Sequence, residues 1–232
     1  MSLHPSMETP TLTTMVVLYT MKVRLDTDRL VRDLPLTDRI IKIEKQGVLK
    51  RGESSRDKIR HRPKAEGPPR RTTGFGHNSI TLVVLSDGDG SLRLKEITVK
   101  IFQNGVFHIT GVLDERYDRD VTQRLHDHIC ATCPESMDGT VWDTASRRVV
   151  LMNYKTRLLE TTNLSRETLH ARVRRLGYKC NYEPAVYPAV KIYFPDTKWI
   201  AKVFRTGNII LTGMTSASEC DRMMEQLRSV LA

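Results

Sequence analysis

The chain has 232 residues, of which 39% are hydrophobic, and a formal net charge of +10 with an isoelectric point near 9.6. This length suits one large domain or two small ones, and the lack of any apolar run of about 20 residues excludes a membrane-spanning helix. The positive charge favours a polyanionic partner, either nucleic acid or an anionic membrane surface.

The N-terminal segment and the cysteines indicate the compartment. No basic segment followed by an apolar core opens the sequence, so no secretory signal is predicted and residues 1–12 are expected to form a disordered leader. The four cysteines are too few and too scattered for a disulfide framework. We therefore expect a soluble, intracellular protein with free thiols.

The elements predicted for the first half are a strand, a helix, an antiparallel meander and a closing helix. Thr14–Leu25 is rich in β-branched and apolar residues and predicts a strand, and Asp26–Asp28 supplies caps for a helix that runs to Arg32 or beyond. Alternating and amphipathic patterns predict the remaining elements. These are the strands Ile80–Ser86, Glu96–Phe102 and Val106–Thr110 and the helix Asp114–His128.

The second half repeats this plan after a link at residues 130–147. The predicted elements are the strand Val149–Thr156, the helix Arg166–Leu176, the strands Tyr178–Tyr182, Ala189–Phe194, Lys198–Phe204 and Ile209–Thr212, and the helix Ala217–Leu231. Residues 13–129 and 148–232 are thus predicted to be two pseudo-symmetric repeats of an α+β fold. Helices would cover one face of each antiparallel sheet, and the other face would be open.

An internal repeat supports this plan. Lys100–Gly111 reads KIFQNGVFHITG and Lys202–Gly213 reads KVFRTGNIILTG, at an offset of 102 residues. Val16-Val17-Leu18 and Val149-Val150-Leu151 match in the same way near the start of each half. Because both matches occur in the same order, gene duplication is the simplest explanation.

A basic insertion interrupts the first repeat at about residues 47–76. It carries nine Lys or Arg residues against three acidic ones, so its net charge of 9 − 3 = +6 is more than half of the total. A solvated loop and a segment that wraps nucleic acid or recruits a partner are both compatible with this composition.

Both halves carry a pattern that resembles the TATA-box-binding protein family, more clearly in the second half than in the first. The residues concerned are Tyr182-Glu183-Pro184, Tyr187-Pro188, Val203-Phe204, Gly207 and Leu211-Thr212-Gly213, and then Arg24-Leu25-Asp26, Ile101-Phe102, Gly105 and Ile109-Thr110-Gly111. The resemblance implies a saddle-shaped, curved antiparallel sheet with helices on its convex face and with a concave face that grips the minor groove of DNA.

The resemblance also implies which aromatic residues enter base steps. Phe204 and Tyr187 match the wedge pair of the second half, and Phe102 matches one wedge of the first half. The other wedge is either His77, by strand register, or Phe75, by residue type. A core position is the alternative for each aromatic. The recurrence of Phe at positions 102 and 204, each three residues before a Gly, favours the wedge role.

Further positions match the groove-contacting residues of the family. Thr110 and Thr212 match threonines that donate hydrogen bonds to base acceptors, which suits the acceptor-rich minor groove of A·T pairs. Val17 and Val150 match apolar residues that line the groove, although plain strand valines would look the same.

Several positions depart from the family pattern. The family has an Asn near the start of each half, where this chain has Thr14 or Met15, and Arg148. Lys100 and Lys202 stand where the family has apolar groove-lining residues. Arg148, Lys100 and Lys202 predict stronger phosphate or groove affinity with weaker base discrimination. Such divergence is typical of a distant relative, for example one encoded by a large DNA virus.

The resemblance therefore implies a general transcription initiation factor that binds and bends double-stranded, A·T-rich promoter DNA. Its implied partners are a B-type general factor and RNA polymerase, in the nucleus or at a viral replication site, with no cofactor, no membrane and no small-molecule substrate. One alternative is a saddle-fold protein-interaction module of the transcription machinery with weak or non-specific DNA binding. Another is a sheet that stacks single-stranded nucleic acid on its aromatic residues.

Two other groups of residues suggest metal sites, but a simpler interpretation is favoured for each. His126, His128, Cys130 and Cys133 could hold zinc, but a structural site usually brings two ligand pairs across a longer loop, so free side chains at a helix end are favoured. Asp87–Gly90 predicts a hairpin turn rather than a calcium loop, because the bidentate Glu of a calcium loop is misplaced. No nucleophile elbow, phosphate loop or dinucleotide fingerprint is present, so no enzymatic activity is predicted.

Overall fold

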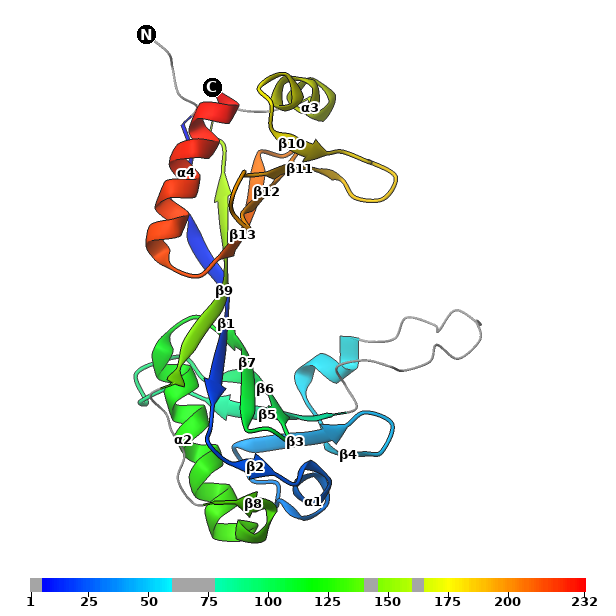
Figure 1. Cartoon of the computed structure of the whole chain (residues 1–232), viewed down its shortest axis with the longest axis vertical. Helices are drawn as coiled ribbons and strands as arrows, with labels where there is room; N and C mark the ends of the chain where they lie inside the picture. The colour runs from blue at the N-terminus through cyan, green and yellow to red at the C-terminus, as the bar shows by residue number, and fades with distance from the viewer. Residues whose placement is uncertain (1–5, 60–77, 140–145, 160–164) are drawn as a thin grey trace. The chain divides into compact units, whose positions relative to one another are not determined.

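The structure is a computed structural model that describes residues 6–59, 78–139, 146–159 and 165–232, and these divide into two compact units (Figure 1). The first unit comprises residues 16–148, and the second unit comprises residues 1–15 together with 149–232. The repeat boundaries predicted from the sequence, 13–129 and 148–232, stay a prediction because the units are defined by packing rather than by repetition.

The first unit is built on a sheet with the strand order β1-β7-β6-β5-β3-β4. The strands are β1 (Thr11–Thr20, whose first residues belong to the second unit), β3 (Ile40–Lys45), β4 (Leu49–Gly52), β5 (Ser79–Ser86), β6 (Lys95–Phe102) and β7 (Val106–Val112). A separate short pair joins β2 (Arg24–Leu25) to β8 (Met137–Asp138). The helices are α1 (Thr27–Asp33), α2 (Glu115–Thr132) and the 3₁₀ turns η1 (Ser55–Ile59) and η2 (Pro134–Ser136).

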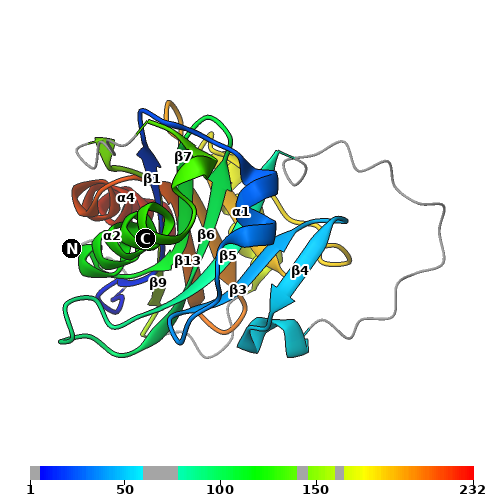
Figure 2. The ribbon, with the colours of Figure 1, turned by 90° about the horizontal axis from the view of Figure 1, so that it is seen from below.

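Local sequence explains where the helices of the first unit begin. Asp26 caps α1, since its side chain accepts a hydrogen bond from the backbone N–H of Arg29 at 2.9 Å. Asp114 caps α2 in the same way. Helix α2 packs on β5 and β7, and α1 packs beside β3 and β4 (Figure 2). The turn η1 lies on the other side of β3 from α1 in both views.

The second unit has the strand order β10-β11-β12-β13-β9. Its elements are β9 (Arg148–Arg157), α3 (Arg166–Arg175), β10 (Lys179–Asn181), β11 (Ala189–Tyr193), β12 (Ile200–Phe204), β13 (Asn208–Met214) and α4 (Ala217–Leu231). Helix α4 turns an apolar stripe to the sheet, and its buried residues are Cys220, Met223, Met224, Leu227 and Val230. Two units of helices on antiparallel strands confirm the predicted α+β class.

A repeated glycine shapes the end of the last strand in each unit. Gly111 and Gly213 both have a positive φ, of 91° and 98°. The pairing of β13 with β9 shifts register between Leu211 and Met214, which marks a β-bulge. A Cβ on Gly213 would lie 1.9 Å from the carbonyl oxygen of Lys198, so only glycine fits there. The Thr-Gly signature of the repeat is thus a structural device as well as a sequence pattern.

The structure adds elements that the sequence patterns do not predict. Strands β3 and β4 and the turn η1 are absent from the predicted elements, and β4 and η1 lie inside the basic insertion. The predicted strand Thr14–Leu25 is instead divided, since β1 ends at Thr20 and β2 holds Arg24 and Leu25. The predicted link at 130–147 holds the end of α2, η2 and β8.

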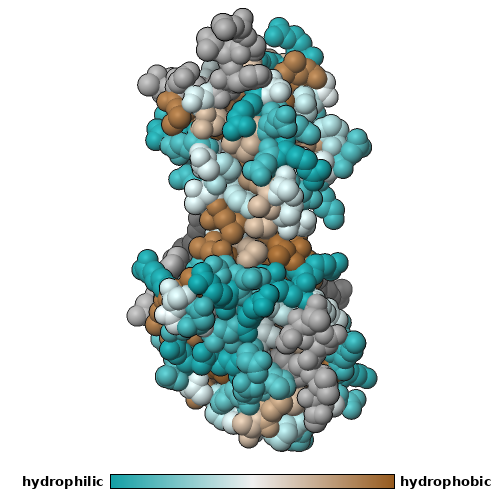
Figure 3. Space-filling model, turned by 90° about the vertical axis from the view of Figure 1, so that its left-hand side faces the viewer, coloured by the Kyte–Doolittle hydropathy of each residue, from teal (hydrophilic) through white to brown (hydrophobic). Residues whose placement is uncertain are grey.

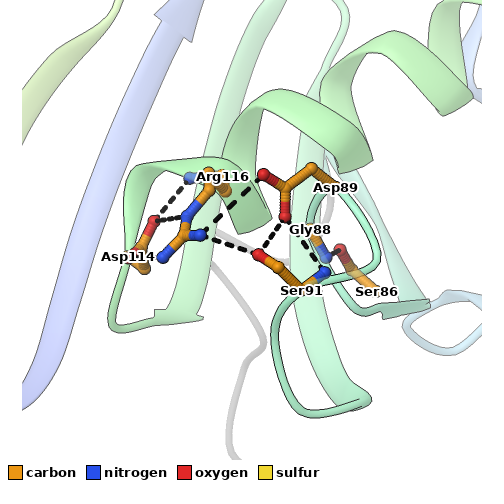
Figure 4. A network of polar contacts seen from close by, with 6 residues as sticks. All are labelled: Ser86, Gly88, Asp89, Ser91, Asp114 and Arg116. Atoms are coloured by element: carbon orange, nitrogen blue, oxygen red, sulfur yellow. Dashed lines mark hydrogen bonds and ion pairs between the residues drawn. The ribbon is translucent and has the colours of Figure 1, made fainter.

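The Asp87–Gly90 segment forms the predicted turn between β5 and β6, and it is tied to the start of α2 (Figure 4). Asp89 accepts hydrogen bonds from the backbone and side chain of Ser91, and the guanidinium of Arg116 donates to the Ser91 hydroxyl at 2.7 Å. Arg116 also binds Asp114 and lowers the pKa of that carboxyl to about 2. These contacts give the turn a structural role.

The surface over α2 is mainly hydrophilic (Figure 3). This agrees with the burial pattern of α2, whose apolar residues Tyr117, Val121, Leu125 and Ile129 are turned inward at intervals of four. Within the described residues, no helix combines the length and apolar character that a membrane span requires.

Candidate nucleic-acid interface

The sheet of the second unit has one buried face and one half-exposed face, as alternation along its strands requires. On β12, Ala201 and Val203 are completely buried, whereas Lys202 and Phe204 point to the half-exposed face. We call this the open face of the second unit. Its members on the three central strands are Lys191 and Tyr193, then Ile200, Lys202 and Phe204, and then Asn208, Ile210 and Thr212.

Two aromatic side chains meet at one end of this open face. The ring centroids of Tyr187 and Phe204 are 6.0 Å apart, and the ring planes are inclined by 60°, which is within the range of favourable aromatic pairs. The turn before β11 positions Tyr187, because its backbone N–H donates to the carbonyl oxygen of Glu183 at 2.8 Å. The structure therefore brings together the two residues predicted as the wedge pair of the second half.

Two lysines flank the ring of Tyr187. The Nζ atoms of Lys191 and Lys202 lie 4.7 Å and 6.0 Å from its centroid, within cation–π range. The two lysines are direct cross-strand partners on β11 and β12. Because like charges at such positions repel each other, an anion bound near them would be favoured. Lys202 is among the predicted residues and Lys191 is not, although the hairpin register with Lys202 would have identified it.

Strands β9 and β10 extend the positive charge of the open face. Lys155 pairs opposite Ile210, and Arg157 pairs opposite Asn208. Lys179 pairs opposite Tyr193, with its Nζ 5.5 Å from that ring. The cations of the open face are Lys155, Arg157, Lys179, Lys191 and Lys202. None of the strand positions named here as members of the face is acidic.

The remaining predicted residues of the second half lie at different places. Thr212 is on the open face, opposite Ile200. Arg148 begins β9 and is exposed. Alternation along β9 puts Val150 on the face of Met152, which packs against the core. The same alternation puts Asn153 on the open side with Lys155, a position that the sequence patterns missed.

The first unit has a corresponding open face on β6 and β7. Phe102, Lys100 and Thr98 alternate along β6 with buried residues. Lys100 is paired with His108, and Thr98 with Thr110. Burial, and then the charge of Lys100, lower the pKa of His108, so this imidazole is neutral near pH 7. The face thus holds the predicted Phe102, Lys100 and Thr110, together with His108, which was not predicted.

Three predicted positions of the first half lie elsewhere or outside the described residues. Val17 is completely buried in β1 and shares a face with Tyr19, whose hydroxyl donates to Asp118 of α2. That position faces the helix side of the strand. His77 and Phe75 lie outside the described residues, so the choice between them for the second wedge of the first half stays a prediction.

The His/Cys constellation does not assemble among the described residues. Cys130 Sγ lies 3.4 Å from His126 Nε2, but His128 Nε2 contacts the carbonyl oxygen of Pro35 at 2.9 Å and Cys133 is completely buried. Among the residues that the structure describes, no group of three or more His, Cys, Asp or Glu side chains is arranged to hold a metal ion.

Comparisons with known proteins give a family match for part of the chain and a similar fold. Residues 163–232 match the sequence family described as transcription factor TFIID, or TATA-binding protein. Among solved structures, the chain is similar to the TATA-binding protein of Methanococcus jannaschii, with a TM-score of 0.55 and 13% sequence identity over 96% of this chain and 98% of that chain. No curated protein sequence matches the chain.

Proposed function

We propose that this chain, whose residues 163–232 match the TATA-binding-protein family and whose fold is that of the family, is a DNA-binding transcription factor. It binds the minor groove of A·T-rich promoter DNA, bends the duplex, and nucleates an initiation complex with a B-type general factor and RNA polymerase. Its site of action is then the nucleus or a viral replication site. The observation that carries the proposal is the contact between Tyr187 and Phe204 on a cationic open face.

Each group on the open face has a physical role in this proposal. Phe204 and Tyr187 enter a base step and replace the stacking that the kink removes, and Phe102 does the same in the first repeat. The hydroxyls of Thr212 and Thr110 donate to the base acceptors of A·T pairs. Because the hydroxyl of Tyr187 stays polar, it remains hydrated at the edge of the step.

The lysines change the balance between affinity and selectivity. Lys191 and Lys202 are close to the aromatic pair, so their charges fall where the phosphates beside the kinked step lie. Neutralising phosphates releases counterions and strengthens binding at every sequence. We therefore expect A·T selectivity that is modest and that rests on the threonines and on the flexibility of TA steps.

The test compares a labelled TATA duplex with a GC-rich duplex of equal length over a salt series, with end-to-end energy transfer reporting the bend. We expect A·T-selective, bent binding that is lost in Phe204→Ala. The matched control is Tyr182→Ala, which removes a ring that lies against Arg166 and Glu167 of α3 instead of on the open face. Bending that survives in Phe204→Ala would contradict the wedge role.

A second candidate is a protein-interaction module of the transcription machinery with weak, non-specific DNA binding. The observation that favours it is that chain segments already contact part of the first unit's open face, at Glu96 and Thr98. In the same assay this module would bind both duplexes equally, with a steep salt dependence and no bending.

A further inference from the structure

The 3₁₀ turn η1, which lies inside the basic insertion, contacts the open face of the first unit. The backbone N–H and the hydroxyl of Ser55 both donate to the carboxylate of Glu96, each at 2.8 Å. Nη1 of Arg56 donates to the hydroxyl of Thr98 at 3.0 Å. Glu96 and Thr98 are alternate residues of β6, on the same face as Lys100 and Phe102. Turn η1 therefore covers one end of that face.

The covered end is the one that holds a predicted base-contacting residue. Thr98 is the direct cross-strand partner of Thr110. Nη2 of Arg56 lies 3.4 Å from the point that a Cβ on Gly111 would occupy. The guanidinium thus lies beside Thr110, on the face that a bound duplex is proposed to contact.

A partly buried ion pair between Lys42 and Asp57 anchors this turn. Asp57 accepts hydrogen bonds from Nζ of Lys42 at 2.8 Å and from the backbone N–H of Ser54 at 3.0 Å, and these contacts lower its pKa. Burial alone would lower the pKa of Lys42, but its bonds to Asp57 and Glu44 outweigh burial and raise it. The Lys42–Asp57 ion pair is thus a favourable contact. The hydrogen bonds of Ser55 and Arg56 to β6, by contrast, are exposed to water.

The surroundings of the repeated glycine differ between the two units. The three atoms nearest to a Cβ on Gly213 belong to Lys198 and Trp199, the strand neighbours of the same hairpin, whereas Nη2 of Arg56 is among the nearest at Gly111. In the first unit a segment from outside the hairpin thus lies beside this glycine.

We propose that Ser55–Asp57 is a built-in competitor for the first repeat's DNA-contacting face. This inference rests on the proposed function. A duplex reaches Thr110 only after Ser55 and Arg56 leave Glu96 and Thr98. Asp57 stays bound to Lys42 during this exchange and holds the displaced turn nearby. Exposed hydrogen bonds are weak in net terms, so duplex contacts can replace them.

The test uses the full chain and the TATA duplex. Glu96→Ala removes the acceptor of Ser55 and is expected to bind about tenfold more tightly and to bend the duplex faster, a change equal to about 1.4 kcal/mol. Glu96→Gln is the control, since it removes the same charge at the same place and keeps an oxygen that can accept from Ser55. Any gain that comes from charge alone appears in both variants.

Hydrogen exchange gives a second readout at the turn itself. The Ser55 amide is bonded to Glu96, so its exchange is expected to accelerate when duplex binds. Arg56→Ala distinguishes a competitor from a direct DNA contact, since a competitor's loss leaves affinity equal or higher. If duplex slows Ser55 exchange and Arg56→Ala weakens binding tenfold, Arg56 is a groove-contacting arginine and the competitor is refuted, with the proposed function intact. If neither the wild type nor Glu96→Ala binds any duplex, the proposed function fails, and the competitor with it.

Discussion

Replacing Asp118 with Ala should remove the strongest buried polar contact of the first unit. The Asp118 side chain is completely buried in α2 and receives three hydrogen bonds. Nε and Nη2 of Arg147 donate at 2.8 Å and 2.9 Å, and the hydroxyl of Tyr19 donates at 2.5 Å. Through these bonds α2 holds both β1 and the residue that leads into β9.

The expected loss of stability follows from what the substitution leaves behind. Breaking a buried ion pair by removing one partner destabilises a protein by about 3–5 kcal/mol, because an unpaired charge stays inside. The Arg147 side chain keeps 21% of its surface exposed, so water compensates part of the loss. We therefore expect Asp118→Ala to reduce the free energy of unfolding by about 3 kcal/mol. Tyr19→Phe removes one donor and should reduce it by about 1 kcal/mol.

Urea unfolding, monitored by far-ultraviolet circular dichroism, measures this loss of stability. Hydrogen exchange of the β5 and β6 amides assigns the loss to the first unit. The control is Asp127→Ala on the same helix, whose side chain is 63% exposed. A double-mutant cycle with Arg147→Ala should give a coupling of about 2 kcal/mol. The reasoning is refuted if Asp118→Ala is no more destabilising than Asp127→Ala.

Three further predictions concern single residues. Gly213→Ala should lower the free energy of unfolding of the second unit by more than about 2 kcal/mol in urea, because its Cβ would lie 1.9 Å from the Lys198 carbonyl oxygen. The control Gly177→Ala, whose Cβ would meet nothing within 4 Å, should lower it by about half as much. Asp114→Ala should lower the free energy of unfolding by about 1 kcal/mol through the lost helix cap. The stabilisation by this carboxylate is present above its ordinary pKa of 3.8 and is lost as the pH falls through about 2. Acidification should therefore reduce the stability of the variant less than that of the wild type. Burial raises the pKa of Cys220 to about 11, so iodoacetamide at pH 8 should label this thiol only after unfolding, and labelling of the native protein would contradict its packing.

The sequence predicted most of the strands and helices because their signals are local and repeated. Helix α4 spans the predicted Ala217–Leu231, and β6 differs from the predicted strand by one residue at its start. In both cases apolar alternation, caps and glycine turns agree with one another. The pairing of Tyr187 with Phe204, whose rings are in contact, came from the family resemblance rather than from these local signals.

Strand β3 was not predicted because its lysines are buried. Lys42 and Lys45 are each 7% exposed, which a hydropathy pattern does not anticipate. Their partners, Asp57 and Asp28, lie at least 15 residues away in sequence. For the same reason the composition of the insertion did not predict that Asp57 is tied to the sheet through Lys42. Charge counts along a chain do not reveal which charges pair in space.

The two open faces show how such pairing redistributes a net charge of +10. On the first unit, Lys42 is neutralised by Glu44 and Asp57, and Glu96 lies on the same face as Lys100. On the second unit the cations face outward around Tyr187 and Tyr193 without acidic strand neighbours at the named positions. At these positions the second unit therefore presents positive charge without nearby acidic strand residues, whereas the +6 of the basic insertion belongs to the first unit. A polyanion near the aromatic pair would meet Lys191 and Lys202 directly, whereas on the first face it would have to displace the contacts of Ser55 and Arg56.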